Sequence, residues 1–200
     1  ELLVGFISEL AAEAGITLQE ITGVAVSAGP GSFTGLRIGI ATAMGLAYGL
    51  SLETCGVNTL AAIAWNTRRE GALVCPLLDA KRQEAYAALY RVGPGQPVTI
   101  IEPAAVPVAK LATLLANRGE PIIVTGPAAE KFRPYLEKSG GNSLEFISPV
   151  EAKPSAKAVA RLGVMIFESG GGLNPAKLQP VYLRRSDAEY AKMKQSEFCR

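Results

Sequence analysis

The stretch from Ser27 to Arg37, with the sequence SAGPGSFTGLR, constrains the fold more than any other part of the chain. It follows an apolar run at residues 21–26 and opens a long apolar run at residues 36–50. Glycine adopts backbone angles that other residues avoid, and proline fixes one φ angle near about −65°. The pattern therefore predicts a strand that enters a helix through a tight turn. Amides at such a helix start can bind an anion, or the turn can pack closely against a partner.

Helix-like and strand-like runs alternate along the whole chain, which predicts an α/β fold. A polar break with a glycine at residues 68–71 divides the pattern into an N-terminal lobe at residues 1–70 and a C-terminal lobe at residues 71–185. Helices are expected at residues 1–14, 34–50, 59–67, 108–117, 128–138 and 156–168, and strands at residues 21–26, 52–57, 72–78, 85–92, 98–102, 121–126 and 144–147.

The charge balance of the chain argues against independent nucleic-acid binding. Twenty basic and 18 acidic side chains give a net charge of +2, without the concentrated basic face that such binding usually requires. Basic and acidic residues alternate near the C-terminus, so we interpret residues 186–200 as a solvated tail. No apolar run approaches the ~20 residues of a membrane span, and no membrane contact is expected.

The sequence contains no histidine. This excludes a Ser-His-Asp triad, a Cys-His dyad and any histidine-ligated metal site. The three cysteines, Cys55, Cys75 and Cys199, match no metal-binding spacing, and their odd number is compatible with a reducing compartment. We therefore predict a cytoplasmic protein without catalytic or metal-binding residues.

Small residues recur every fourth position in the long helix expected at residues 34–50. Gly35, Gly39, Ala43 and Ala47 share one helix face, which allows another backbone to approach closely. Each interior glycine costs about 0.5–1 kcal/mol, so close approach is expected to compensate for it. The spacing leaves open whether this stripe faces a partner protein or the sheet of its own lobe.

A secondary hypothesis is anion or nucleotide binding at Gly29, Gly31 and Asp79. The glycine turn is not a P-loop, and its glycines have one residue too many for the dinucleotide fingerprint. Asp79 opens a charged turn at residues 79–84, where a carboxylate beside backbone amides could hold a magnesium nucleotide. An ordinary polar turn is the favoured interpretation of that segment.

Four segments, at residues 28–39, 56–60, 77–90 and 180–185, closely resemble the TsaB (YeaZ-like) family of the M22 glycoprotease-like superfamily. Members of this family are bacterial subunits needed for threonylcarbamoyladenosine in tRNA. The resemblance covers nearly the whole chain. It implies an actin-like (ASKHA) ATPase fold of two RNase H-like lobes.

The resemblance also implies a non-catalytic role. The catalytic paralogue, TsaD, carries a metal-binding His-x-x-x-His after a Val-Asn pair, whereas Val57-Asn58 of this chain is followed by Thr59 and Ile63. The implied partners are a TsaD-like catalytic subunit and a TsaE-like ATPase, with no cofactor required and a nucleotide site at the partner interface left open. The implied interface, on the first two helices, contains Leu3, Phe6, Ile7, Leu10, Gly35, Arg37, Gly39 and Ala43.

The chain departs from this family at its N-terminus. Family members begin with a strand hairpin before the first helix, and this sequence has no such segment. We therefore expect an incomplete first lobe, whose strand at residues 21–26 has a bare edge. We also expect a homodimer in isolation, because an apolar helix face is a liability when uncovered. Direct tRNA contact is left open, and the rival hypothesis is an enzyme, either a small actin-fold ATPase or phosphotransferase, or an M22-type peptidase.

Overall fold

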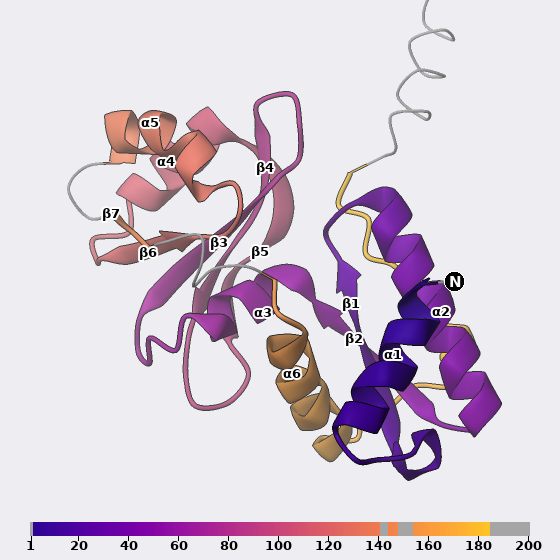
Figure 1. Ribbon diagram of the computed structural model, residues 1–200. Helices are drawn as coiled ribbons and strands as arrows, with labels where there is room; N and C mark the ends of the chain where they lie inside the picture. Colours follow the sequence, from indigo (N-terminus) through magenta and orange to yellow (C-terminus); the bar gives the residue numbers. More distant parts are fainter. Residues whose placement is uncertain (1, 141–143, 148–153, 185–200) are drawn as a thin grey trace, which may run out of the picture.

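Two β-sheets organise the chain (Figure 1). The computed structural model describes residues 2–140, 144–147 and 154–184, so the expected tail at residues 186–200 lies outside the described residues. The first sheet is a parallel pair, β1 (Gly23–Gly29) and β2 (Glu53–Asn58). The second sheet has the order β5-β4-β3-β6-β7. Its strands are β3 (Leu73–Asp79), β4 (Glu84–Arg91), β5 (Val98–Pro107), β6 (Ile122–Thr125) and β7 (Leu144–Phe146).

Helices separate and cover the strands, so the predicted α/β class is confirmed. Among the described residues, β1 forms a ladder with β2 alone, and β2 makes one further antiparallel bridge, from Thr54 to Leu173. The helices are α1 (Leu2–Glu13), α2 (Phe33–Leu50), α3 (Thr59–Asn66), α4 (Val108–Ala116), α5 (Ala129–Gly140) and α6 (Ala156–Glu168), with short 3-10 turns η1 (Leu18–Glu20) and η3 (Pro175–Lys177).

Helix α2 begins where the glycine turn ends. Ser32 caps it, because its hydroxyl accepts a hydrogen bond from the Gly35 amide at 3.3 Å. One side of α2 then packs on β1, where Ile40 and Ala43 meet Val24 and Val26. A strand, tight turn and helix in this order were predicted from the sequence and are confirmed.

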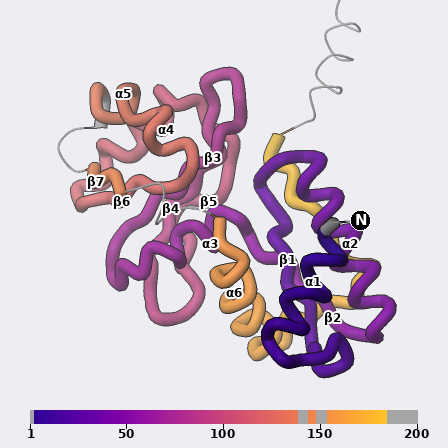
Figure 2. Tube along the Cα trace, viewed as in Figure 1, coloured from indigo at the N-terminus to yellow at the C-terminus, as the bar shows by residue number. Residues whose placement is uncertain are grey.

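Helix α6 packs against the first sheet rather than the second, which corrects the predicted extent of the C-terminal lobe. An added Cβ on Gly163 would lie 2.3 Å from the Cβ of Ala25, so only glycine permits this approach. The Cys55 thiol donates to the Gly163 carbonyl at 3.8 Å. The chain after α6 continues over the same sheet, where the Val181 amide donates to the Ala28 carbonyl at 2.7 Å. Figure 2 shows this yellow segment returning beside α2.

The second sheet carries the largest core. Helices α4 and α5 cover one face, around the fully buried Phe132 and Leu136. Helix α3 covers the other face with Leu60, which packs with Val74 and Tyr90. The opposite side of α3 packs with the first sheet and α6, so this helix belongs to both cores (Figure 1).

The sequence analysis found no apolar run long enough to span a membrane, but helix α2 meets the criteria of length and composition for such a span. Its 18 residues have a mean hydropathy of 1.2, which makes it long and apolar enough to cross one, although only 22% of the helix is buried. In this fold α2 lies along β1 with Leu36, Ile40, Ala43 and Ala47 buried against its own chain. A helix of a globular protein passes the same test. Most residues of this apolar helix are exposed or half-buried.

Candidate partner-binding surface

Helix α1 exposes its apolar residues. Phe6 and Leu10 are 54% and 63% exposed, and Leu3 and Val4 are exposed as well. Ile7 is half-buried, and Ala11 is the buried residue of the helix among those whose side chains are described. The structure therefore places Leu3, Phe6 and Leu10 where a partner can reach them, and Ile7 at the edge of that surface.

Helix α2 adds a second exposed apolar surface. Ile38 and Tyr48 are 56% and 54% exposed, and Gly35 is exposed near the start of the helix. In Figure 1, α1 and α2 lie at the end of the molecule away from the second sheet. We call the exposed side chains of Leu3, Phe6, Leu10, Ile38 and Tyr48 the apolar helix surface.

Two of the four residues of the small-residue stripe, Ala43 and Ala47, face the chain's own core, which corrects part of the predicted interface. Ala43 is buried with Ile40 and Leu178, and Ala47 is fully buried. Gly39 is half-buried, and an added Cβ would lie 3.8 Å from Val26. Ala43 is thus a core residue, because β1 and the returning C-terminal segment occupy the side of α2 on which it lies.

Arg37 belongs to an aromatic cluster at the start of α2. Its Nε donates to the Tyr182 hydroxyl at 3.1 Å, and its guanidinium lies 3.9 Å from the centre of the Phe33 ring. The rings of Phe33 and Tyr182 are 4.7 Å apart. Arg37 and Tyr182 are exposed, so this cluster extends the accessible surface of α2 onto the C-terminal segment.

Backbone conformation and close packing explain why glycine occupies position 29 in the glycine turn. Gly29 has a φ of 118°, and an added Cβ would lie 2.6 Å from the Val181 carbonyl oxygen. Gly31 is half-buried beside Leu36. Close approach of the C-terminal segment therefore accounts for Gly29 without a bound anion.

Asp79 forms an ion pair within the second lobe. Its carboxylate accepts from the Lys131 ammonium at 2.7 Å and from the Lys81 amide at 2.8 Å. Partial burial raises the pKa of Asp79, but these hydrogen bonds and the two lysine charges outweigh it, so the pKa lies below its ordinary value. The described contacts join Asp79 to Lys81 and Lys131, and anion or nucleotide binding at Gly29, Gly31 and Asp79 stays a prediction.

Replacing Asp79 by asparagine is expected to lower the free energy of unfolding at pH 7 by about 0.5–1 kcal/mol. A carboxylate with a lowered pKa stabilises the fold above its unfolded pKa of about 3.9, and this contribution is lost as the pH falls through the folded value. The difference between wild type and variant should therefore narrow in acid. Urea unfolding of both proteins from pH 7 to pH 3 measures this difference in the free energy of unfolding. A difference that grows in acid would contradict the ion pair.

The described residues offer no metal centre and no activated thiol. They contain no group of three or more metal-ligating side chains. Burial raises the pKa of Cys55 to about 11 and that of Cys75 to about 12, so neither is a thiolate nucleophile at neutral pH. Cys199 lies outside the described residues.

Comparisons with known proteins identify the family of this chain. The family model described as TsaD, tRNA N6-adenosine threonylcarbamoyltransferase, matches residues 1–164. The chain is 28% identical over 171 residues to the tRNA threonylcarbamoyladenosine biosynthesis protein TsaB of Bacillus subtilis, covering 86% of this chain and 73% of that protein. It is 41% identical over 87 residues to TsaB of Escherichia coli, covering 42% of this chain and 38% of that protein.

A solved structure from Pseudomonas aeruginosa, described as an uncharacterized protein with similarity to the peptidase YEAZ, superposes with a TM-score of 0.78. Its sequence is 27% identical, and the match covers 91% of this chain and 82% of that one. The architecture fits an actin-like, RNase H-like α/β fold, and the chain belongs to the tRNA N6-adenosine threonylcarbamoyltransferase family. Within that family it is a TsaB/YeaZ-like protein.

Sequence reasoning missed three exposed residues of this region. Ile38 and Tyr48 lie off the four-residue stripe, and Tyr182 follows α2 by more than 130 positions. Helical periodicity could have identified Ile38, because this large apolar residue lies on a different face of the helix from the small-residue stripe. Tyr182 lies in a segment that carries the family resemblance, but no periodicity placed it beside α2.

Proposed function

We propose that this chain is a non-enzymatic subunit in the biosynthesis of threonylcarbamoyladenosine in tRNA, which docks on a TsaD-like catalytic subunit and activates it. The single observation that supports docking is the apolar helix surface. Large apolar side chains exposed together on neighbouring helices commonly mark protein interfaces. Phe6 and Tyr48 are aromatic anchors of the type that dominates binding energy in interfaces.

Two side chains support the non-enzymatic part of the proposal. Thr59 and Ile63 occupy the positions of the metal-binding histidines in the catalytic paralogue. The Thr59 and Ser27 hydroxyls lie 2.6 Å apart and hydrogen-bond to each other, and Ile63 is fully buried. Thr59 therefore joins the start of α3 to the first sheet, and Ile63 belongs to the buried interior. The printed names of the TsaB relatives support the pathway.

The partners follow from the same proposal. A TsaE-like ATPase joins the pair, and the chain forms a homodimer when the catalytic subunit is absent, with two-fold symmetry over the apolar helix surface. Docking requires no cofactor. A nucleotide at the partner interface and direct contact with tRNA stay open predictions, as does the cytoplasmic location.

The experiment combines the purified chain with a TsaD-like subunit and a TsaE-like ATPase. We expect no ATP hydrolysis by the chain alone, co-elution with the catalytic subunit in gel filtration, and modification of tRNA only when the chain is present. Co-elution without any effect on modification would leave docking intact and refute the activating role. Robust ATP hydrolysis by the chain alone would instead favour the actin-fold ATPase.

A further inference from the structure

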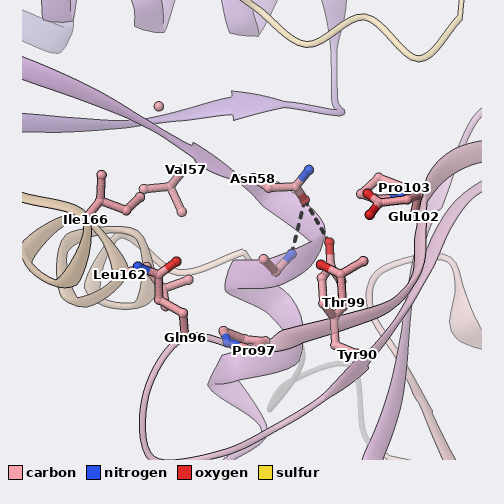
Figure 3. A pocket seen from close by; sticks show the side chains of 12 residues that line it. Val57, Asn58, Tyr90, Gln96, Pro97, Thr99, Glu102, Pro103, Leu162 and Ile166 are labelled. Atoms are coloured by element: carbon pink, nitrogen blue, oxygen red, sulfur yellow. Dashed lines mark hydrogen bonds between the residues drawn. The ribbon is translucent and has the colours of Figure 1, made fainter. Parts of the chain in front are cut away.

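A cavity of about 300 Å³ lies where the two sheets approach each other (Figure 3). Strand β2 and helix α6 form one wall, and strands β4 and β5 form the other. None of the residues of the apolar helix surface, the glycine turn or the Asp79 turn lines it. Its volume is at the lower end of the range for small-molecule sites.

The floor of the cavity is apolar and buried. Val57 from β2 and Leu162 from α6 are each about 2% exposed, and Ile166 lies one helical turn beyond Leu162. Burying a short hydrocarbon stem against such a floor removes apolar surface from water, which favours binding. The floor therefore favours a ligand with an apolar stem.

The opposite side of the cavity carries hydrogen-bond acceptors. The Tyr90 hydroxyl donates to Asn58 Oδ1 at 3.4 Å, and that oxygen also accepts from the Leu60 and Ala61 amides (Figure 3). Because the Tyr90 proton is committed to Asn58, the phenolic oxygen can only accept from a ligand. Thr99 lies beside it at the rim.

Glu102 supplies the one formal charge among the described residues that line the cavity. Burial raises the pKa of Tyr90, and the negative charge of Glu102 raises it further. No lysine or arginine is among these lining residues, so a phosphate or carboxylate ligand would meet only negative charge. A hydrogen-bond donor with positive charge fits the lining.

We propose that this cavity binds a small organic cation, a primary ammonium on a short apolar stem. The ammonium donates to the Glu102 carboxylate and to the Tyr90 oxygen, and the stem lies on the floor of Val57, Leu162 and Ile166. An occupant would touch both sheets at once. It would therefore stabilise the folded arrangement by RT ln(1 + [L]/Kd), where [L] is the concentration of the free ligand.

The test is a titration of the full chain with n-butylamine, followed by amide NMR shifts. Butyrate and 1-butanol share the stem and serve as probes with negative and no charge. We expect saturable shifts at Ala61, Thr99 and Glu102 with a Kd of about 1–10 mM for butylamine, and no saturable binding of the other two. No saturation with butylamine, or equal binding of all three probes, would overturn the proposal.

Two variants separate the charge from the cavity. Glu102→Gln keeps the shape of an exposed side chain and should weaken butylamine binding at least tenfold, whereas the matched change Glu168→Gln, on α6 outside the cavity, should not. Tyr90→Phe removes the hydroxyl, and with it the accepting oxygen and the hydrogen bond to Asn58, and should weaken binding several-fold. Thermal unfolding confirms that each variant is folded, and unchanged affinity of folded Glu102→Gln protein would refute the assignment.

Discussion

The Phe6→Asp protein is expected to bind a TsaD-like catalytic subunit at least about 100-fold more weakly than wild type while keeping its fold. Phe6 is more than half exposed and lies one helical turn from Leu10, the most exposed large apolar residue of α1. The change removes an aromatic anchor and places a carboxylate where the interface excludes water, so an unpaired charge would be desolvated on binding. Isothermal titration calorimetry with the catalytic subunit measures the loss.

The matched control is Ser8→Asp. Ser8 is exposed on the same helix, and at about 100° per residue it lies about 200° around the axis from Phe6. The Ser8→Asp change adds the same charge outside the apolar helix surface. The affinity for the catalytic subunit should therefore change less than about threefold. Equal losses in the two variants would indicate a general electrostatic effect and would refute the interface. Circular dichroism of each variant checks that α1 is intact.

The glycine turn illustrates what local pattern can and cannot predict. Glycine and proline after an apolar run predicted a strand, a turn and a helix, and these elements are present. The reason for Gly29 is tertiary, because the Val181 carbonyl that demands a glycine comes from the far end of the sequence. A local pattern does not predict that contact. The sequence alone therefore could not distinguish anion binding from close packing.

The small-residue stripe shows a related limit. A spacing of four predicts one shared helix face, and the structure has Ala43 and Ala47 on such a face. Periodicity does not say whether a shared face points inward. Here the inward side of α2 carries Ala43 and Ala47 together with two large residues, whereas Ile38 and Tyr48 are exposed. The predicted helix was right and part of the predicted surface was wrong.

Helix α6 is the element that the sequence analysis assigned to the wrong lobe. It follows the strands of the second sheet, so proximity along the chain assigned it to that lobe. Gly163 permits it to lie against Ala25 instead, and a lone glycine in an amphipathic helix costs only about 1 kcal/mol and reveals no partner. The pairing depends on shape complementarity between distant segments, which composition and spacing do not encode.

Replacing Phe132 by alanine is expected to lower the free energy of unfolding by about 3–5 kcal/mol. Phe132 is fully buried in the core of the second lobe, so its loss removes a large apolar area and leaves a cavity. Natural domains are stable by only about 5–15 kcal/mol, so this one change removes a large share. The matched control is Tyr135→Ala on the same helix, where half of the side chain is exposed and about 1 kcal/mol or less should be lost.

The same variant tests whether the two cores unfold together. The chain has a single tryptophan, Trp65, which lies in the core of the first lobe with α6. Helix α3 packs into both cores, and the buried Arg184 donates to the Ala80 carbonyl of the second lobe. Because of these connections, Phe132→Ala should shift the urea midpoint of Trp65 fluorescence as far as that of circular dichroism. A fluorescence midpoint that stays at its wild-type value would instead show that the lobes unfold independently.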